Sequence, residues 1–147
     1  MISKEQILLD MLSGEASRVL HASHEVKDSA ITNTKLIKEL YPYLPEIKKK
    51  SSNLQYGGAI LPNKRFVEKA IQMIEASVDE KCLCEYLFDD FGQNGKNMER
   101  FGFVLLEETM DNYINKSIIE CPVCFQRYEV VEEDTGWHIN STRYRKI

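Results

Sequence analysis

The chain has 147 residues, of which 43% are hydrophobic and 10% aromatic, so it can bury a core and is not a disordered segment. Its formal net charge of −4 disfavours a nucleic-acid binder, since such proteins normally carry an excess of Lys and Arg. No stretch approaches the run of about 20 apolar residues that a transmembrane helix needs, and the first residues do not resemble a signal peptide. We therefore expect a cytoplasmic protein with no membrane contact.

The N-terminal residues predict helices. Ser3 and Gln6 form a capping-box pattern, in which each side chain satisfies a backbone N–H of the first helical turn. Apolar residues then recur at helical spacing as far as Leu12, and Gly14 weakens or ends this helix. A looser apolar stripe over residues 16–26 continues the helical pattern.

The middle of the chain alternates between helical and broken patterns. Thr34 is a candidate cap for a short helix over residues 35–40, and the two prolines of Tyr41–Pro45 are expected to stop it. Lys48–Lys50 follow as a polar, exposed stretch. Asn63 is the expected N-cap of the clearest helix, whose apolar stripe consists of Val67, Ala70, Ile71, Ile74 and Val78.

From Cys82 onward the pattern favours β-strands. Residues 101–106 form an apolar run typical of a strand buried on both faces, and residues 113–120, 125–132 and 137–144 resemble further strands. Asp111-Asn112 and residues 133–136 are the expected turns between them. The predicted fold class is α+β: a helical N-terminal part, residues 1–78, packed on a small, mostly antiparallel, zinc-clamped sheet in a β part, residues 79–147. The two parts are expected to share one core.

Four cysteines fall in two tight pairs, Cys82 with Cys84 and Cys121 with Cys124. In a reducing compartment, close Cys pairs separated by a long insert favour metal binding over disulfides. Zinc prefers four tetrahedral ligands, and residues two apart on a bent strand can both reach one ion. A site with four thiolates leaves no position open for water or substrate, so we expect one structural Zn²⁺ rather than a catalytic one.

The segment Cys121-Pro122-Val123-Cys124 resembles the second knuckle of zinc-ribbon proteins, where C-P-x-C occupies a β-turn between strands. The resemblance implies a zinc-ribbon-like C-terminal part. Two features depart from the ribbon pattern: Phe125 stands where ribbons usually have Gly, and the first pair is C-x-C instead of C-x2-C. Redox chemistry is the main rival reading, but redox C-x2-C motifs open a helix, whereas a strand pattern follows Cys124. Four buried cysteines without a metal remain a further alternative.

Other polar residues are weaker candidates. His138 is a candidate substitute ligand, or a residue hydrogen-bonded to a ligand, although an ordinary strand position is favoured. His21 and His24 are favoured as surface or half-buried residues. Two basic groups are candidate nucleic-acid contacts, with solvated surface as the favoured alternative; their members are Lys48, Lys49 and Lys50, and Arg143, Arg145 and Lys146.

No phosphate-binding glycine motif or nucleophile elbow occurs in the sequence, so the residues do not argue for an enzyme. The leading hypothesis is a non-enzymatic zinc-binding protein that acts through protein–protein interaction, as an adaptor, regulator or neutralising partner. The second is a nucleic-acid-binding zinc ribbon, which requires the two basic groups to converge. The third is an enzyme with a pocket formed by His21 or His24 and a carboxylate.

Overall fold

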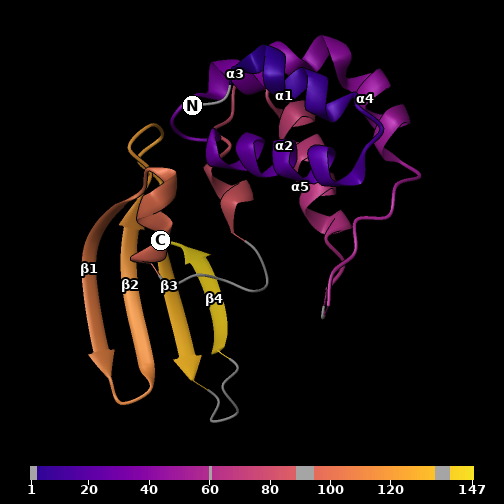
Figure 1. Ribbon diagram of the computed structural model, residues 1–147. Helices are drawn as coiled ribbons and strands as arrows, with labels where there is room; N and C mark the ends of the chain where they lie inside the picture. The colour runs from indigo at the N-terminus through magenta and orange to yellow at the C-terminus, as the bar shows by residue number, and fades with distance from the viewer. Residues whose placement is uncertain (1–2, 60, 89–94, 135–139) are drawn as a thin grey trace. The chain divides into compact units, whose positions relative to one another are not determined.

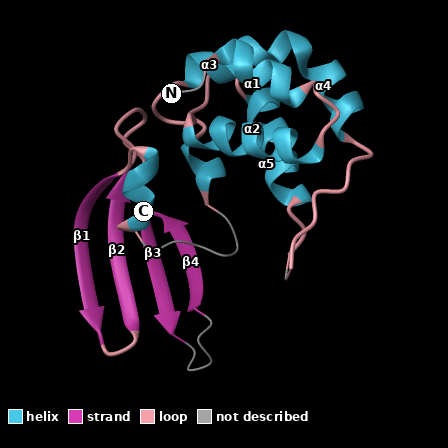
Figure 2. Cartoon of the chain, viewed as in Figure 1, coloured by secondary structure: helices cyan, strands magenta, loops and turns pink. Residues whose placement is uncertain are grey.

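The computed structural model describes residues 3–59, 61–88, 95–134 and 140–147. The chain divides into two compact units, Met1–Tyr86, the helical unit, and Leu87–Ile147, the sheet unit (Figure 1). The α-helices all lie in the first unit and the strands in the second (Figure 2). The predicted α+β class is therefore confirmed.

The helical unit packs its helices around one apolar core. Its elements are α1 (Lys4–Met11), α2 (Ala16–Asp28), α3 (Thr34–Leu40), the 3-10 helix η1 (Tyr41–Tyr43), α4 (Leu44–Ser51) and α5 (Lys64–Ala76). Each α-helix contributes side chains that are at most 1% exposed: Ile7, Met11, Val19, Val26, Ile37, Leu40, Ile47, Met73 and Ile74. Most of these residues belong to the apolar stripes that the helical periodicity predicts; Met73 on α5 and Ile47 on the unpredicted α4 do not.

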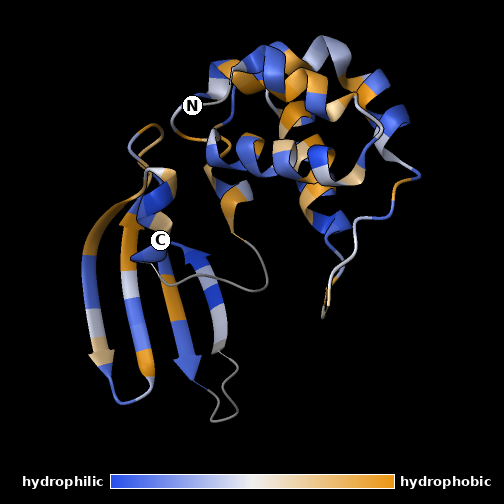
Figure 3. Cartoon of the chain, viewed as in Figure 1, coloured by the Kyte–Doolittle hydropathy of each residue, from blue (hydrophilic) through white to orange (hydrophobic). Residues whose placement is uncertain are grey.

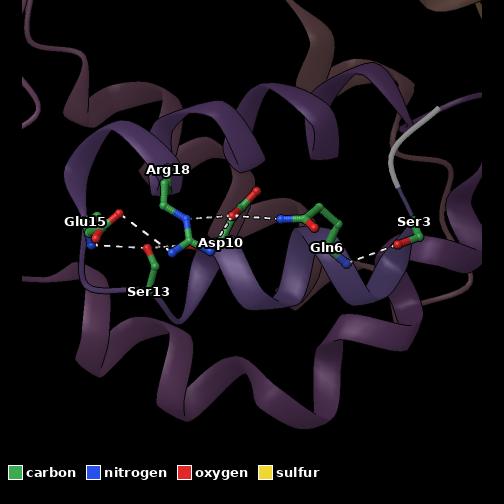
Figure 4. A network of polar contacts seen from close by, with 6 residues as sticks. All are labelled: Ser3, Gln6, Asp10, Ser13, Glu15 and Arg18. Carbon is green, nitrogen blue, oxygen red and sulfur yellow. Dashed lines mark hydrogen bonds and ion pairs between the residues drawn. The ribbon is translucent and has the colours of Figure 1, made fainter.

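A buried carboxylate joins the first two helices (Figure 4). Ser3 caps α1 as predicted, because its Oγ accepts from the backbone N–H of Gln6 at 3.2 Å. The Gln6 side chain does not complete the capping box in the expected way, since its Nε2 donates to Oδ1 of Asp10 at 3.1 Å. Asp10 is 6% exposed and also accepts from Nε of Arg18 on α2, at 2.9 Å. The polar contacts thus fix the crossing of α1 and α2.

The helix α3 ends at Leu40, directly before the proline segment, as predicted, but a 3-10 helix and a further α-helix follow it, which the sequence did not predict. Pro42 lies in the first turn of η1 and Pro45 in the first turn of α4. A first-turn proline lacks only an N–H that would have no helical partner, and its fixed φ suits a helix. The chain therefore continues into α4, whose apolar Leu44 and Ile47 are buried. Lys48, Lys49 and Lys50 are exposed as expected, but in the last turn of this helix.

Two asparagines define the starts of α3 and α5. Asn33, not Thr34, caps α3, and its side chain accepts from the N–H of Leu36 at 3.3 Å. Asn63 occupies the N-cap position of α5 as predicted, yet its side chain makes no cap hydrogen bond. Its Nδ2 instead donates to the carbonyl of Tyr56 at 3.0 Å and fastens the preceding loop.

The sheet unit contains four antiparallel strands in the order β1-β2-β3-β4. The strands are β1 (Val104–Asp111), β2 (Ile114–Glu120), β3 (Arg127–Asp134) and β4 (Asn140–Lys146), preceded by the short helices η2 (Cys84–Leu87) and η3 (Asn97–Phe101). The turn after Asp111 is confirmed: Asn112 has φ 53°, a left-handed conformation that Asn tolerates. The other predicted turn, at residues 133–136, lies partly outside the described residues, and β3 runs through Asp134.

One face of the sheet is apolar on its two inner strands, β2 and β3. Ile119 and Val130 are fully buried there, beside Tyr128, which is 1% exposed. The ring of Phe88 lies 4.7 Å from that of Tyr128 and 4.2 Å from that of Tyr144 on β4. The opposite face carries cross-strand ion pairs, Glu120 with Arg127 and Glu129 with Arg145.

The prediction of a doubly buried strand over residues 101–106 is wrong. Phe101 ends η3, and Gly102 follows with φ 109°, a conformation that glycine adopts without strain. The strand begins only at Val104, at the sheet edge, where Val104 is 46% and Leu106 40% exposed. The apolar run therefore covers two different environments. Phe101 and Phe103, before the strand, are buried, whereas Val104 and Leu106 lie in an exposed strand.

Within the described residues, no helix is both long enough and apolar enough to cross a membrane.

Candidate metal centre

The four cysteines come together in the fold. The Sγ atoms of Cys82, Cys84, Cys121 and Cys124 all lie within 4.8 Å of one another, and the residues are thiols rather than disulfides. A tetrahedral site with sulfur about 2.3 Å from zinc places its sulfurs about 3.8 Å apart. The cluster is therefore close to the size that one tetrahedral ion requires, and it can hold a metal with little adjustment.

The first pair sits on a bend rather than on a strand. Leu83 is at the bend, and Cys84 opens the short helix η2, where the N–H of Tyr86 donates to the carbonyl of Leu83 at 3.1 Å. The local bend that the sequence predicts is present. The extended strand on which Cys82 and Cys84 were expected to lie is not, because Cys84 opens a short helix. Leu83 is 2% exposed and anchors the bend in apolar surroundings, while the thiols on either side of it reach the cluster. In the sequence, this anchor is indicated by the apolar Leu83 standing between two candidate ligands.

The second pair lies on a tight loop that precedes β3. The N–H of Cys121 donates to the carbonyl of Gln126 at 3.0 Å, and the N–H of Phe125 donates to the carbonyl of Cys121 at 2.9 Å. These two bonds close the loop at its base, and Pro122 stiffens it by fixing φ. Because β3 begins at Arg127, the segment after Cys124 is a strand, as predicted. A redox C-x2-C motif would have a helix N-terminus there to stabilise a thiolate, and residues 121–134 contain none.

Phe125 itself adopts the left-handed backbone conformation for which glycine is usual at this position in zinc ribbons. Its φ is 64°, in the left-handed region that favours glycine, so the departure noted in the sequence carries a conformational cost. The phenyl ring is 69% exposed and therefore gains little from packing within the chain. The position after Cys124 therefore has a backbone conformation that glycine would adopt more easily than Phe125 does.

The burial of the thiols is graded across the cluster. Cys84 and Cys121 are 2% and 0% exposed, Cys82 is intermediate, and Cys124 is exposed. Four thiolates around a divalent ion carry a net charge of about −2, and soft sulfur ligands select Zn²⁺ among the common divalent ions. The exposed Cys124 would give an ion a route in, while the two buried sulfurs would limit the access of water.

The remaining candidate residues are not brought into this cluster by the described structure. His138 lies outside the described residues. Lys48 forms an ion pair with Glu75 at 2.6 Å and so joins α4 to α5. Lys48–Lys50 occupy the C-terminal turn of α4, where positive charge stabilises the helix dipole, which is a structural reason for this group.

The basic residues of the other group lie on β4. Arg143, Arg145 and Lys146 are exposed, and Arg145 forms an ion pair with Glu129 at 2.9 Å. The two basic groups thus belong to different units of the chain.

A cavity of about 290 Å³ in the helical unit is lined by Gln72, Glu75, Ala76, Asp79 and Tyr86. No histidine lines it. Of the two helical histidines, His21 has its Nε2 3.9 Å from Glu25 on the helix surface, and the ring of His24 packs against Phe66 with centroids 4.7 Å apart. These contacts fit the predicted surface and half-buried positions.

No family model matches the chain, and no significant match occurs among the curated proteins or the solved structures. The class of protein is therefore defined by the fold and the cysteine cluster: an α+β protein with a four-cysteine site able to bind a metal ion.

Proposed function

We propose that the chain is a non-enzymatic protein in which Cys82, Cys84, Cys121 and Cys124 hold one structural Zn²⁺, and that it acts by binding another protein. The observation that carries the proposal is the convergence of all four sulfurs within 4.8 Å. With every thiol used as a ligand, the ion has no open position and serves as a clamp rather than a catalyst. The knuckle at Cys121–Cys124 then has the role that the zinc-ribbon resemblance implies.

The interaction role rests on surface and charge. Several large apolar side chains are exposed in the sheet unit, among them Met110 at 69% and Tyr113 at 72%. The formal net charge of −4 suits a protein partner better than a polyanion. An adaptor, a regulator and a neutralising partner of another protein would all use such a scaffold.

The metal part of the proposal is tested by elemental analysis of purified protein. We expect close to one equivalent of zinc per chain and a loss of most of it in Cys121→Ser, because Cys121 is fully buried and a neutral hydroxyl is a poor replacement for a thiolate. Val123→Ser is the matched control, since Val123 lies in the same loop but is 55% exposed and supplies no ligand. It should retain the zinc content of the wild type.

Two results would contradict the metal site. One is wild-type protein, prepared without chelator, that carries no zinc and takes up none on titration. The other is Cys121→Ser with an unchanged zinc content. A folded wild type with disulfides between these cysteines would assign them instead to redox chemistry.

One observation favours a second function, a nucleic-acid-binding zinc ribbon: Arg143, Tyr144 and Arg145 place basic and aromatic side chains side by side in the sequence of an exposed strand. It predicts retention on single-stranded DNA or RNA at low salt, with affinity that falls steeply as salt rises. Wild type and Arg143→Glu eluting together without retention would eliminate this second function.

A further inference from the structure

The outer edge of β1 is the most open backbone in the sheet. β1 ends the strand order and pairs only with β2 among the described residues. Seven of its eight residues are exposed, including Val104, Leu106 and Met110 at 46%, 40% and 69%. Alternate N–H and C=O groups of such a strand point away from its neighbour and are available to another strand. Figure 3 shows the apolar start of β1 and the hydrophilic stretch that follows it.

The acidic residues of β1 lack the cross-strand ion pairs that acidic residues of β2 and β3 form. Glu120 is paired with Arg127 at 3.1 Å and Glu129 with Arg145 at 2.9 Å. Glu107, Glu108 and Asp111 on β1 form no ion pair within the described part of the chain. Their negative charge is therefore not compensated by a neighbouring strand, and it lies along an edge that can accept a further strand.

The register places these carboxylates on both faces of the edge. Glu107 and Asp111 face the same side as Lys116, which stands opposite Thr109 and is in ion-pair contact with neither. Glu108 stands opposite Ser117 and accepts a hydrogen bond from Asn115 at 3.4 Å. The irregularity between Leu105 and Glu107 leaves a regular stretch, Glu107–Asp111, along the acidic part.

This charge pattern discriminates between occupants of the edge. A second copy of β1 in antiparallel pairing would place carboxylates opposite or diagonal to carboxylates, which is destabilising. A strand with Lys or Arg at alternate positions would place cations opposite Glu107 and Asp111, each pair being worth a modest favourable amount. The remaining, apolar positions of the same strand would lie on the other face, that of Met110.

We propose that the β1 edge docks an extended, basic segment of a partner protein, which adds to the sheet as a fifth strand. Main-chain hydrogen bonds to β1 hold the segment, and Glu107, Glu108 and Asp111 select its positive side chains. This inference rests on the proposed function, because it names the partner chemistry of an interaction protein. It is independent of the metal site, whose ligands lie on other segments.

The test uses two synthetic seven-residue peptides with the zinc-loaded full chain. One alternates Lys and Val, which places every Lys on one face of a strand, and the other has Glu in place of Lys. We expect the Lys peptide to bind and to slow hydrogen exchange of β1 amides, with weaker binding as salt rises. The variant Glu107→Lys with Asp111→Lys should bind this peptide about tenfold more weakly and should accept the Glu peptide.

The matched control is Glu46→Lys with Glu80→Lys, which changes the net charge equally at exposed positions of the helical unit. It should bind like the wild type. Equal weakening in the control, or peptide binding without protection of β1, would overturn the docking site. A wild type whose β1 amides become protected as its own concentration rises would show that the occupant is a second copy. Zinc content is measured on the same samples, so a failed edge with intact zinc rejects this inference and leaves the metal site standing.

Discussion

The helical unit and the sheet unit bury their side chains in different ways. In the helical unit every α-helix contributes almost fully buried side chains to one core, so its interior is closed by chain alone. In the sheet unit β1 is exposed along nearly its whole length, and β4 is mostly exposed where its side chains are described. The sheet therefore has a smaller apolar core for its size, and the turn that joins β2 to β3 is where the second pair of cysteines lies. A metal ion bound there would therefore add the most stability to the unit in which side-chain burial contributes the least.

The largest expected effect is that of metal removal. Structural zinc contributes binding free energy on the order of 10 kcal/mol at neutral pH, and this energy is coupled to folding. We expect a strong chelator to lower the melting temperature of the sheet unit sharply, while helical circular dichroism persists to higher temperature. Hydrogen exchange measured residue by residue separates the two units. Chelation that leaves β2 and β3 as protected as before would show that the sheet is stable without an ion.

The next effect concerns the buried carboxylate of the helical unit. Asp10→Ala removes the acceptor of Arg18 and Gln6, so we expect a loss of about 1–3 kcal/mol in the free energy of unfolding. Glu15→Ala is the control, because Glu15 lies 3.7 Å from the same Arg18 but its side chain is 64% exposed. It should cost less than about 0.5 kcal/mol. Urea denaturation measures both. Because Asp10 is not one of the four cysteine ligands, we also expect Asp10→Ala to keep the zinc content of the wild type.

The sequence predicted the parts of this fold that depend on local periodicity. The Ser3 cap and the core of the α5 stripe, Val67, Ala70 and Ile74, follow from local spacing and are present, whereas the predicted Val78 lies beyond the end of α5 and is 40% exposed. The helix α4 was missed because Pro42 and Pro45 disfavour helix before them, yet each falls in a first turn where proline is tolerated. Whether a proline starts or stops a helix depends on the residues after it, here the buried Leu44 and Ile47.

The candidate site was predictable in its members and less so in its shape. Pair spacing was enough to group Cys82 and Cys84 with Cys121 and Cys124. The 3-10 turn at Cys84 was not predicted, because nothing local distinguishes a bent strand from a bend that opens a short helix. The exposure of β1 was missed for a similar reason: Val104 and Leu106 are as apolar as a buried strand, and only the strand order makes them an edge.

A smaller effect of opposite sign is expected at the knuckle. Phe125→Gly relieves a left-handed conformation that costs a non-glycine residue about 1–2 kcal/mol, while glycine loses about 0.5–1 kcal/mol more entropy on folding. We therefore expect a net gain between zero and about 1.5 kcal/mol with unchanged zinc content. Asn112→Gly is the control, since Asn112 has φ 53° and Asn tolerates this region better than Phe. A destabilised Phe125→Gly would mean that the exposed ring contributes packing after all.

The smallest effect belongs to the helical unit and appears only in alkali. The hydroxyl of Tyr56 donates to the carbonyl of Ser51 at 2.7 Å, and burial raises the pKa of Tyr56 above its usual value of 10.0. Because the folded state holds this proton more tightly than the unfolded chain, the contribution is complete below pH 10 and is lost as the pH rises through the raised pKa.

Tyr56→Phe should cost about 0.5–1 kcal/mol at neutral pH and should flatten the fall of stability above pH 10. Tyr43→Phe, at a position 41% exposed, is the control and should leave both the neutral value and the alkaline slope unchanged. Denaturation curves of the three proteins between pH 8 and about pH 11 measure the difference. If wild type and Tyr56→Phe lose stability in parallel across that range, the phenol is not held by burial. Equal stability of the two proteins at neutral pH would mean that the contact to Ser51 contributes nothing to the fastening of the loop after α4.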